Sequence, residues 1–156
     1  MSAVEQRLAD MGITLPTPAA PAANYIPFRI VQNVVYISGQ LPKQDGNLLH
    51  PGTVGNDVSI EDGYEAAKWC AINLLAQLKV ACDGDLDRVE CCIKLGGFVQ
   101  STPEFKSHPE IINGASDLMV AALGEAGRHA RFAVGAPSLP RNTSVEIDGI
   151  FAIRSS

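Results

Sequence analysis

Apolar residues along this chain recur at two spacings, and each spacing predicts a different kind of element. Alternating apolar and polar positions, or a short apolar run between turn residues, are typical of β-strands, whereas apolar residues three and four positions apart are typical of helices. The first pattern predicts five strands, at residues 26–31, 34–37, 89–95, 130–135 and 144–153. A loop rich in Gly, Asn, Asp and Pro, at 43–56, has room for one more short strand.

Two long helices are predicted between these strands. The first begins after Ser59, whose side chain is suited to cap a helix together with Asp62, and it ends before Gly84. The second begins near Pro109, a residue favoured in the first helical turn, and ends at Gly127. Packing against a core explains the apolar stripe of each helix, so neither stripe indicates a cofactor site.

The order of these elements predicts the fold class. Two strands, a helix, a strand, a helix and two more strands favour an α+β domain, in which a mixed sheet of about six strands has two helices packed on one face. This single domain is expected to span residues 25–156. Residues 1–24, with a short helix within 1–12 and then a Pro- and Ala-rich stretch, are expected to form an N-terminal arm.

The last predicted strand is apolar on both of its faces. One face carries four large apolar residues, and the other places Ile150 and Ala152 beside Glu146 and Asp148. Two helices can cover only one face of the sheet, so the sequence predicts an oligomer that buries part of the other face.

Composition and charge argue against several classes of protein. The 156 residues are 46% hydrophobic and 19% charged, a globular composition, and no apolar stretch is long enough to span a membrane. The net charge is −5 and no run of Lys and Arg exceeds two residues, so nucleic-acid binding is not expected. Residues 1–11 lack the apolar run of a signal peptide, and we therefore expect a cytoplasmic protein.

The cysteines and histidines show no metal-binding pattern. Cys91 and Cys92 are adjacent on a predicted strand and so point to opposite faces, and Cys70 and Cys82 lie twelve positions apart in a predicted helix. We interpret all four as buried free thiols in a reducing compartment. The three histidines have no ligand spacing, and no metal or other cofactor is predicted.

No single residue of this chain indicates a chemistry by itself. The sequence has no phosphate-binding glycine loop, no nucleophile elbow and no convincing Ser/His/Asp arrangement. Taken alone, Arg131 is explained as a surface residue or as the ion-pair partner of Glu146, and Tyr25 as a packing residue with a solvated hydroxyl.

Three separated segments become informative when they are considered together. The segment Ser38-Gly-Gln-Leu-Pro42 follows a short strand, and Tyr25 lies thirteen residues before Ser38. Arg131 precedes a Leu-Pro pair by eight residues, and Glu146 follows that proline by six. In this order and spacing, over about residues 22–154, the segments resemble the Rid (reactive intermediate deaminase) family, also called the YjgF or liver perchloric-acid-soluble protein family.

The resemblance implies a chorismate-mutase-like fold and a homotrimer with a ligand cleft at each subunit interface. Active members of the family hydrolyse enamines and imines of 2-keto acids, such as 2-aminoacrylate and 2-iminopropanoate, to the keto acid and ammonia. Arg131 matches the residue that holds the substrate carboxylate by two parallel hydrogen bonds, and Glu146 matches the residue that orients the attacking water. The resemblance assigns the remaining ligand-binding positions to Tyr25, Ser38, Gly39, Gln40, Asn113 and Ala133.

Two departures from the family pattern fall beside the arginine. Ala133 stands where many members carry a cysteine, and His129 stands where a small residue or proline is common. An imine deaminase is favoured over a non-enzymatic binder or sensor of small carboxylates, because binding alone requires Arg131 and not Glu146. An endoribonuclease, an activity attached to some family names, is disfavoured by the acidic charge balance.

Overall fold

The structure, a computed structural model, describes residues 1–18, 20–21 and 23–156. Its helices are α1 (Ala3–Asp10), α2 (Ile60–Ala81) and α3 (His108–Leu123). The strands are β1 (Phe28–Val31), β2 (Val34–Gln40), β3 (Lys43–Gln44), β4 (Asn47–Leu48), β5 (Val89–Gln100), β6 (Ala130–Ala136) and β7 (Val145–Ile153). Three 3-10 turns join some of them: η1 (Leu86–Arg88), η2 (Gly124–Gly127) and η3 (Pro140–Asn142). None of the described helices is long and apolar enough to cross a membrane.

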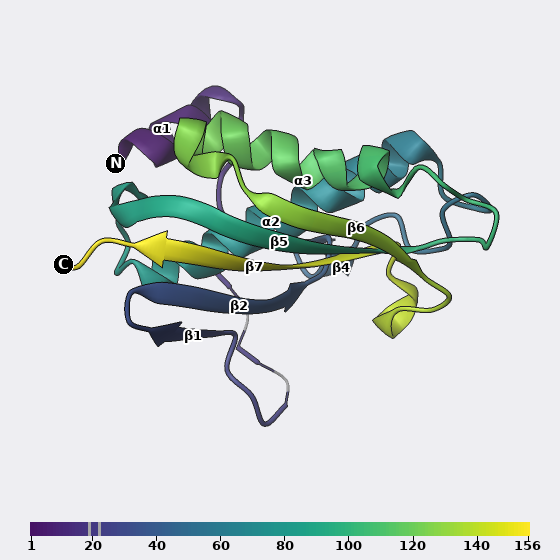
Figure 1. The fold of residues 1–156 in the computed structure, drawn as a ribbon, viewed down its shortest axis with the longest axis horizontal. Helices are drawn as coiled ribbons and strands as arrows, with labels where there is room; N and C mark the ends of the chain where they lie inside the picture. Colours follow the sequence, from purple (N-terminus) through teal and green to yellow (C-terminus); the bar gives the residue numbers. More distant parts are fainter. Residues whose placement is uncertain (19, 22) are drawn as a thin grey trace.

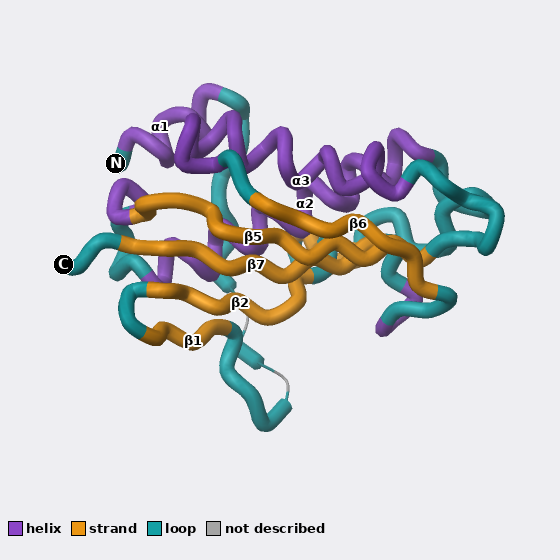
Figure 2. The backbone as a smooth tube through the Cα atoms, in the orientation of Figure 1, coloured by secondary structure: helices purple, strands orange, loops and turns teal. Residues whose placement is uncertain are grey.

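Five of the strands form one mixed sheet, in the order β1-β2-β7-β5-β6. Neighbouring strands are antiparallel except β5 and β6, which run parallel because α3 carries the chain back between them. Helices α2 and α3 lie side by side on one face of this sheet (Figures 1 and 2). The predicted α+β class, with a mixed sheet and two helices on one face, is confirmed. The short strand expected within 43–56 is present as a separate hairpin, β3–β4.

Local capping sets the ends of the two long helices. The Asp62 backbone N–H donates to Ser59 Oγ at 3.1 Å at the start of α2, as predicted. The predicted end of the second helix is wrong, because α3 ends at Leu123 and not at Gly127. Gly124 has a φ of 67°, a left-handed conformation that ends the α-helix, and the next residues form η2.

The third predicted strand is longer than expected. β5 runs to Gln100, whereas alternation predicts an end at Leu95. The glycines that follow Leu95 do not end the strand: a side-chain carbon on Gly97 would come within 2.7 Å of Ile112, so this glycine lets α3 pack directly against β5. Gly97 therefore marks close helix–strand packing, which alternation alone cannot distinguish from a turn.

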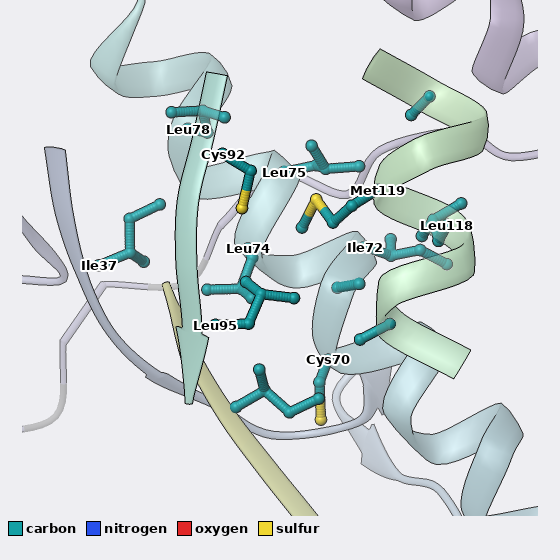
Figure 3. Packing of buried hydrophobic residues seen from close by; sticks show 14 of the residues in the cluster. Ile37, Cys70, Ile72, Leu74, Leu75, Leu78, Cys92, Leu95, Leu118 and Met119 are labelled. Carbon is teal, nitrogen blue, oxygen red and sulfur yellow. The ribbon is translucent and has the colours of Figure 1, made fainter. Parts of the chain in front are cut away.

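The hydrophobic core fills the space between the sheet and its two helices (Figure 3). Leu74 and Leu75 of α2, Leu95 of β5 and Met119 of α3 belong to one cluster and are fully buried. Removing such side chains from water is the main source of folding free energy in a domain of this size. The core therefore depends on the helix-covered face of the sheet.

Three of the four thiols lie in this core, and Figure 3 labels two of them, Cys70 and Cys92. Cys70 and Cys92 are buried, and burial raises the pKa of Cys92 to about 12. Cys82 is buried as well, whereas Cys91 is only half-buried, and all four are free. The interpretation as buried thiols therefore holds for three cysteines, and Cys91 is the exception.

The opposite face of the sheet, called the open face below, carries exposed apolar side chains. Tyr36 of β2, Phe98 of β5 and Val134 of β6 are 47%, 38% and 42% exposed. The strand register places Tyr36 beside Ile150 of β7 and Phe98 beside Val134, so the apolar side chains continue across four strands. Residues of β7 alternate between half-exposed or exposed positions on this face and buried ones on the other, as predicted.

Helix α1 docks the beginning of the N-terminal arm on the domain. The backbone N–H groups of Ala3 and Val4 donate to the Asp87 carboxylate at 2.9 and 3.2 Å, and these bonds hold the pKa of Asp87 below its usual range. Arg7 Nε donates to the carbonyl of Ala122 at 2.7 Å. The arm is thus fixed to η1 and α3 before it continues toward β1.

Candidate functional site

Glu146 lies on the open face, where β7 passes β2. A side-chain carbon on Gly39 would overlap the Glu146 carboxylate, so only a glycine at this position lets the carboxylate lie against the backbone of β2. The register between the two strands shifts from Ile37 to Gln40, an irregularity that surrounds Gly39. Burial, and then the nearby Asp148 carboxylate, raise the pKa of Glu146 above its usual range. A carboxyl group in this state is suited to accept and return a proton.

Two cavities meet at Gly39, which belongs to the lining of both. The larger one, of about 490 Å³, brings together four of the predicted ligand-binding residues with part of the arm: its lining includes Tyr25, Ser38, Gly39, Gln40 and Pro16–Pro18. The smaller one, of about 320 Å³, lies on the open face and is lined by Gly39, Phe98, Leu139, Glu146 and Asp148.

Hydrogen bonds hold β2 in place where the two cavities meet at Gly39. Ser38 Oγ donates to the carbonyl of Pro27 at 3.1 Å, and Gln40 Nε2 donates to the carbonyl of Ser38 at 3.0 Å. The two side chains therefore fix the path of β2 on either side of Gly39. Tyr25, at the entry to β1, is 57% exposed and borders the larger cavity.

Arg131 is held at the other edge of the sheet, by α3. Its Nη1 donates to Ser116 Oγ at 3.1 Å and its Nη2 to the carbonyl of Pro109 at 3.4 Å. Asn113 lies between these two contacts on the same side of α3, at helical spacing. Three of the five guanidinium N–H groups make neither of these bonds and can bind a ligand.

His129 extends this arrangement by one more side chain. Its Nδ1 lies 2.6 Å from the carbonyl of Gly127, which can only accept, so in the neutral imidazole Nδ1 carries the proton and Nε2 is the acceptor. Ser116 Oγ lies 2.8 Å from Nε2 and donates to it, while accepting from Arg131. The serine hydroxyl thus has both of its roles fixed, and the guanidinium is oriented by a chain of hydrogen bonds.

The structure does not bring Arg131 and Glu146 together within one chain. Arg131 and Ala133 face the helix-covered side of β6, whereas Glu146 faces the open side of β7, and β5 lies between the two strands. The interpretation of Arg131 and Glu146 as an ion pair is therefore wrong. The predicted site residues form two separate groups: one at Gly39 and Glu146, the other at Arg131, Ala133 and Asn113.

Comparison with known proteins identifies the family. A family model described as YjgF/chorismate-mutase-like, putative endoribonuclease matches residues 5–152. The chain belongs to this family. The Trypanosoma cruzi protein TCP17 is 40% identical over 153 residues, which cover 97% of this chain and 95% of that protein.

Solved structures of the YjgF family share the fold. Atu1372 of Agrobacterium tumefaciens, a protein with unknown function, is 52% identical with a TM-score of 0.92, covering 97% of this chain and 92% of that one. A Shewanella oneidensis MR-1 protein with the same endoribonuclease description is 36% identical, with a TM-score of 0.93 and coverage of 97% and 100%. RidA from an Antarctic Psychrobacter is more distant, at 25% identity, a TM-score of 0.61 and coverage of 88% and 94%.

Four residues of this YjgF-family chain that contribute to the two groups were not identified from sequence. Ser116 lies in the second helix without any pattern that marks it. His129 is visible only as a departure from the family. Gln77 is a polar residue in a buried stretch of α2, and Arg141 follows the Leu-Pro pair; both line the larger cavity.

Proposed function

We propose that this member of the YjgF family is a deaminase that hydrolyses imines and enamines of 2-keto acids, such as 2-iminopropanoate and 2-aminoacrylate, to the keto acid and ammonia. Family membership and the likeness to RidA support this class of reaction. The observation that carries the proposal is the Glu146 carboxyl, which lies against Gly39 beside a cavity and has a raised pKa. A protein that only binds small carboxylates has no use for such a group.

Arg131 binds the substrate carboxylate in this proposal. Ser116 and the Pro109 carbonyl hold the guanidinium in place, and its remaining N–H groups donate two parallel hydrogen bonds to the carboxylate. This contact fixes the plane of the substrate as well as its position. The imine carbon is already electrophilic, so orientation supplies most of what the reaction needs.

Glu146 orients the attacking water and transfers its proton. The water oxygen bonds to the imine carbon while Glu146 takes a proton from the water. Glu146 returns this proton to the nitrogen, which gives a carbinolamine. A second proton then passes from the carbinolamine hydroxyl to the nitrogen through Glu146, the carbon–nitrogen bond breaks, ammonia leaves and the carbonyl of the keto acid forms. A carboxyl whose pKa is raised toward neutrality is suited to both steps. No metal or other cofactor takes part.

The proposal requires more than one copy of the chain, because Arg131 and Glu146 face opposite sides of the sheet. We infer a cytoplasmic homotrimer in which the open face of one subunit meets the β6 edge of the next. The apolar open face, with Tyr36, Phe98 and Val134 exposed, supports such an interface. Each interface then holds one cleft, with Arg131 from one copy and Glu146 from another.

An endoribonuclease activity has less support, although the family description and the Shewanella relative carry that word. RNA binding relies on neutralising phosphates with basic residues, and this chain has a net charge of −5. A small-carboxylate binder or sensor is the function that remains if hydrolysis is absent.

The first test is imine hydrolysis. An amino-acid oxidase generates 2-iminopropanoate, and its decay is followed as loss of the semicarbazide-trapped form. We expect the wild-type protein to accelerate the decay, and Arg131→Ala and Glu146→Gln to reduce the acceleration by at least about 100-fold. Circular dichroism and sedimentation check that both variants stay folded and assembled. A folded, assembled wild type without any acceleration would reject the deaminase.

Co-expression of the two variants tests whether the site is shared. If each site takes its arginine from one copy and its glutamate from another, about one site in four of a randomly mixed trimer is intact. The mixture should therefore recover about a quarter of wild-type activity, although each variant alone is inactive. No recovery in verified mixed trimers would mean that the two residues do not act in one shared site.

A further inference from the structure

The larger cavity extends beyond the residues that the proposed reaction uses. Its lining continues from β2 to Asn73 and Gln77 of α2, to Pro16–Pro18 of the arm, and to Arg141 of η3. Its volume of about 490 Å³ lies within the range of small-molecule sites. The proposed reaction uses only part of this lining, and two of the other side chains are informative.

Gln77 is a buried polar side chain that borders this cavity. It is 6% exposed and makes no hydrogen bond with any residue that the structure describes. Asn73, which also lines the cavity, does have hydrogen-bond partners: its Nδ2 donates to the carbonyls of Leu41 and Lys43 at 2.9 and 3.1 Å. Because Gln77 lines the cavity, its amide can donate to and accept from a molecule that binds there.

Arg141 supplies charge to the same cavity. Its backbone has a φ of 59°, an uncommon conformation for a residue with a side chain. Within the described part of the chain its guanidinium forms no ion pair or hydrogen bond, and it lines the cavity. The charges of Lys43 and Asp45, which also border the cavity, offset each other, so Arg141 leaves the lining with one net positive charge.

The arm forms one wall of this cavity and is shared by near relatives. The 97% coverage shared with Atu1372 and the Shewanella protein leaves only about five residues unmatched, far fewer than the length of the arm. RidA covers 88%. Most of the arm, and with it this wall, is therefore matched in the two nearer relatives.

We propose that this cavity binds the side chain of the substrate and selects imino acids whose side chain ends in a carboxylate or a carboxamide. This rests on the proposed deaminase function. A terminal carboxylate would accept hydrogen bonds from Arg141 and from the Gln77 amide, and a carboxamide would in addition donate to Gln77 Oε1. Gly39 lines both cavities, so a substrate whose reacting carbon lies beside Glu146 would extend its side chain past Gly39 into this pocket.

Competition between two substrates tests the proposal. Oxidases of matching specificity generate 2-iminopropanoate from alanine and 2-iminoglutarate from glutamate. We expect kcat/KM for iminoglutarate to exceed that for iminopropanoate by about tenfold, since one charge-assisted hydrogen bond is worth about that much. Equal values for the two substrates would overturn the proposal.

Two variants and a control locate the preference. Gln77→Leu keeps the size of the side chain and removes its polar end. Arg141→Gly removes the guanidinium at a backbone conformation that glycine adopts without strain. Each should lower the ratio of the two kcat/KM values by about tenfold. Arg128→Ala removes one positive charge at a 70% exposed side chain and should leave the ratio unchanged.

A binding experiment keeps the pocket testable if no imine is hydrolysed. Calorimetry with the stable products 2-oxoglutarate and pyruvate compares a long and a short ligand on the wild type, Gln77→Leu and Arg141→Gly. Tighter binding of 2-oxoglutarate, lost in both variants, supports the pocket even when the deaminase proposal fails. Deaminase activity without any preference between the ligands rejects the pocket and leaves the deaminase standing.

Discussion

The two faces of the sheet are built from the same strands and differ in almost every physical respect. The helix-covered face places Leu95 and Phe151 in a closed core, and both are fully buried. The open face, from the same strands, exposes Phe98 and carries the half-buried Glu146. Arg131 belongs to the covered side and Glu146 to the open side, so each face holds one half of the proposed chemistry.

This difference explains how the fold can tolerate a reactive site. Residues on the covered face stabilise the monomer, whereas residues on the open face contribute little to the core and are available for assembly and catalysis. On one strand, substitutions that face the helices should therefore lower stability, whereas substitutions on the open face should mainly affect assembly and activity. Substitutions on the two faces test that separation.

The largest expected effect is on stability, and it compares two residues of β5. Leu95→Ala removes a fully buried side chain and should lower the free energy of unfolding by about 2–5 kcal/mol. Phe98→Ala loses mainly an edge-to-face contact with Phe132, at a centroid distance of 5.3 Å, and should cost about 0.5–1.5 kcal/mol in the monomer. Urea denaturation of dilute protein measures both, and similar losses would contradict the separation of the faces.

A smaller effect is expected from Ser116, on the covered side. Ser116→Ala removes the hydroxyl that accepts from Arg131 and donates to His129, at a cost of about 1 kcal/mol in carboxylate binding. KM should therefore rise about fivefold while kcat changes little. Ser116→Thr keeps a hydroxyl and should restore most of the affinity. A fall in kcat at constant KM would show that Ser116 does not act through substrate binding.

The smallest effect is a pH dependence on the open face. Because folding raises the pKa of Glu146, the folded protein keeps this proton to a higher pH than the unfolded chain does. The stability that this group contributes is complete at low pH and is lost as pH rises through the folded pKa. Glu146→Gln mimics the protonated form, so it should be the more stable protein at neutral pH, by less than about 1 kcal/mol, given solvent on one side of the group.

Denaturation at about pH 3.5 and about pH 7 measures this difference, since the advantage of the glutamine should vanish at the lower pH. Glu90→Gln, at an exposed position, is the control and should show no such change. The burial of Glu146 would be contradicted if the stability of Glu146→Gln relative to wild type were lower at neutral pH than at low pH.

Most of the fold could be predicted from the sequence because its signals are local and repeated. Alternation on β7 and the apolar stripes of α2 and α3 each extend over many residues, so one irregular position does not hide them. The errors fall where one residue decides the outcome through tertiary contact. Gly97 is extended because Ile112 packs over it, and α3 ends at Gly124 because of a single backbone angle.

The candidate site was predictable only in part, for a related reason. Arg131 and Glu146 were identified from spaced motifs, which depend on resemblance and carry no information about which face each residue occupies. Ser116 and Gln77 are single polar residues in helices, and only the fold shows that one contacts the arginine and the other borders a cavity. Such positions have no periodic signal in one sequence.

Helix α1 has an entropic consequence for the larger cavity. The helix is capped by Ser2 and bound to the Asp87 carboxylate. The chain is held again just before β1, where the Pro27 carbonyl accepts from the backbone N–H and from the Oγ of Ser38. The wall at Pro16–Pro18 is therefore part of a loop closed at both ends and not a free tail. Closure at both ends restricts the conformational freedom of residues 16–18 before a ligand arrives, so a ligand that enters the cavity loses less of the free energy of its contacts to ordering this wall.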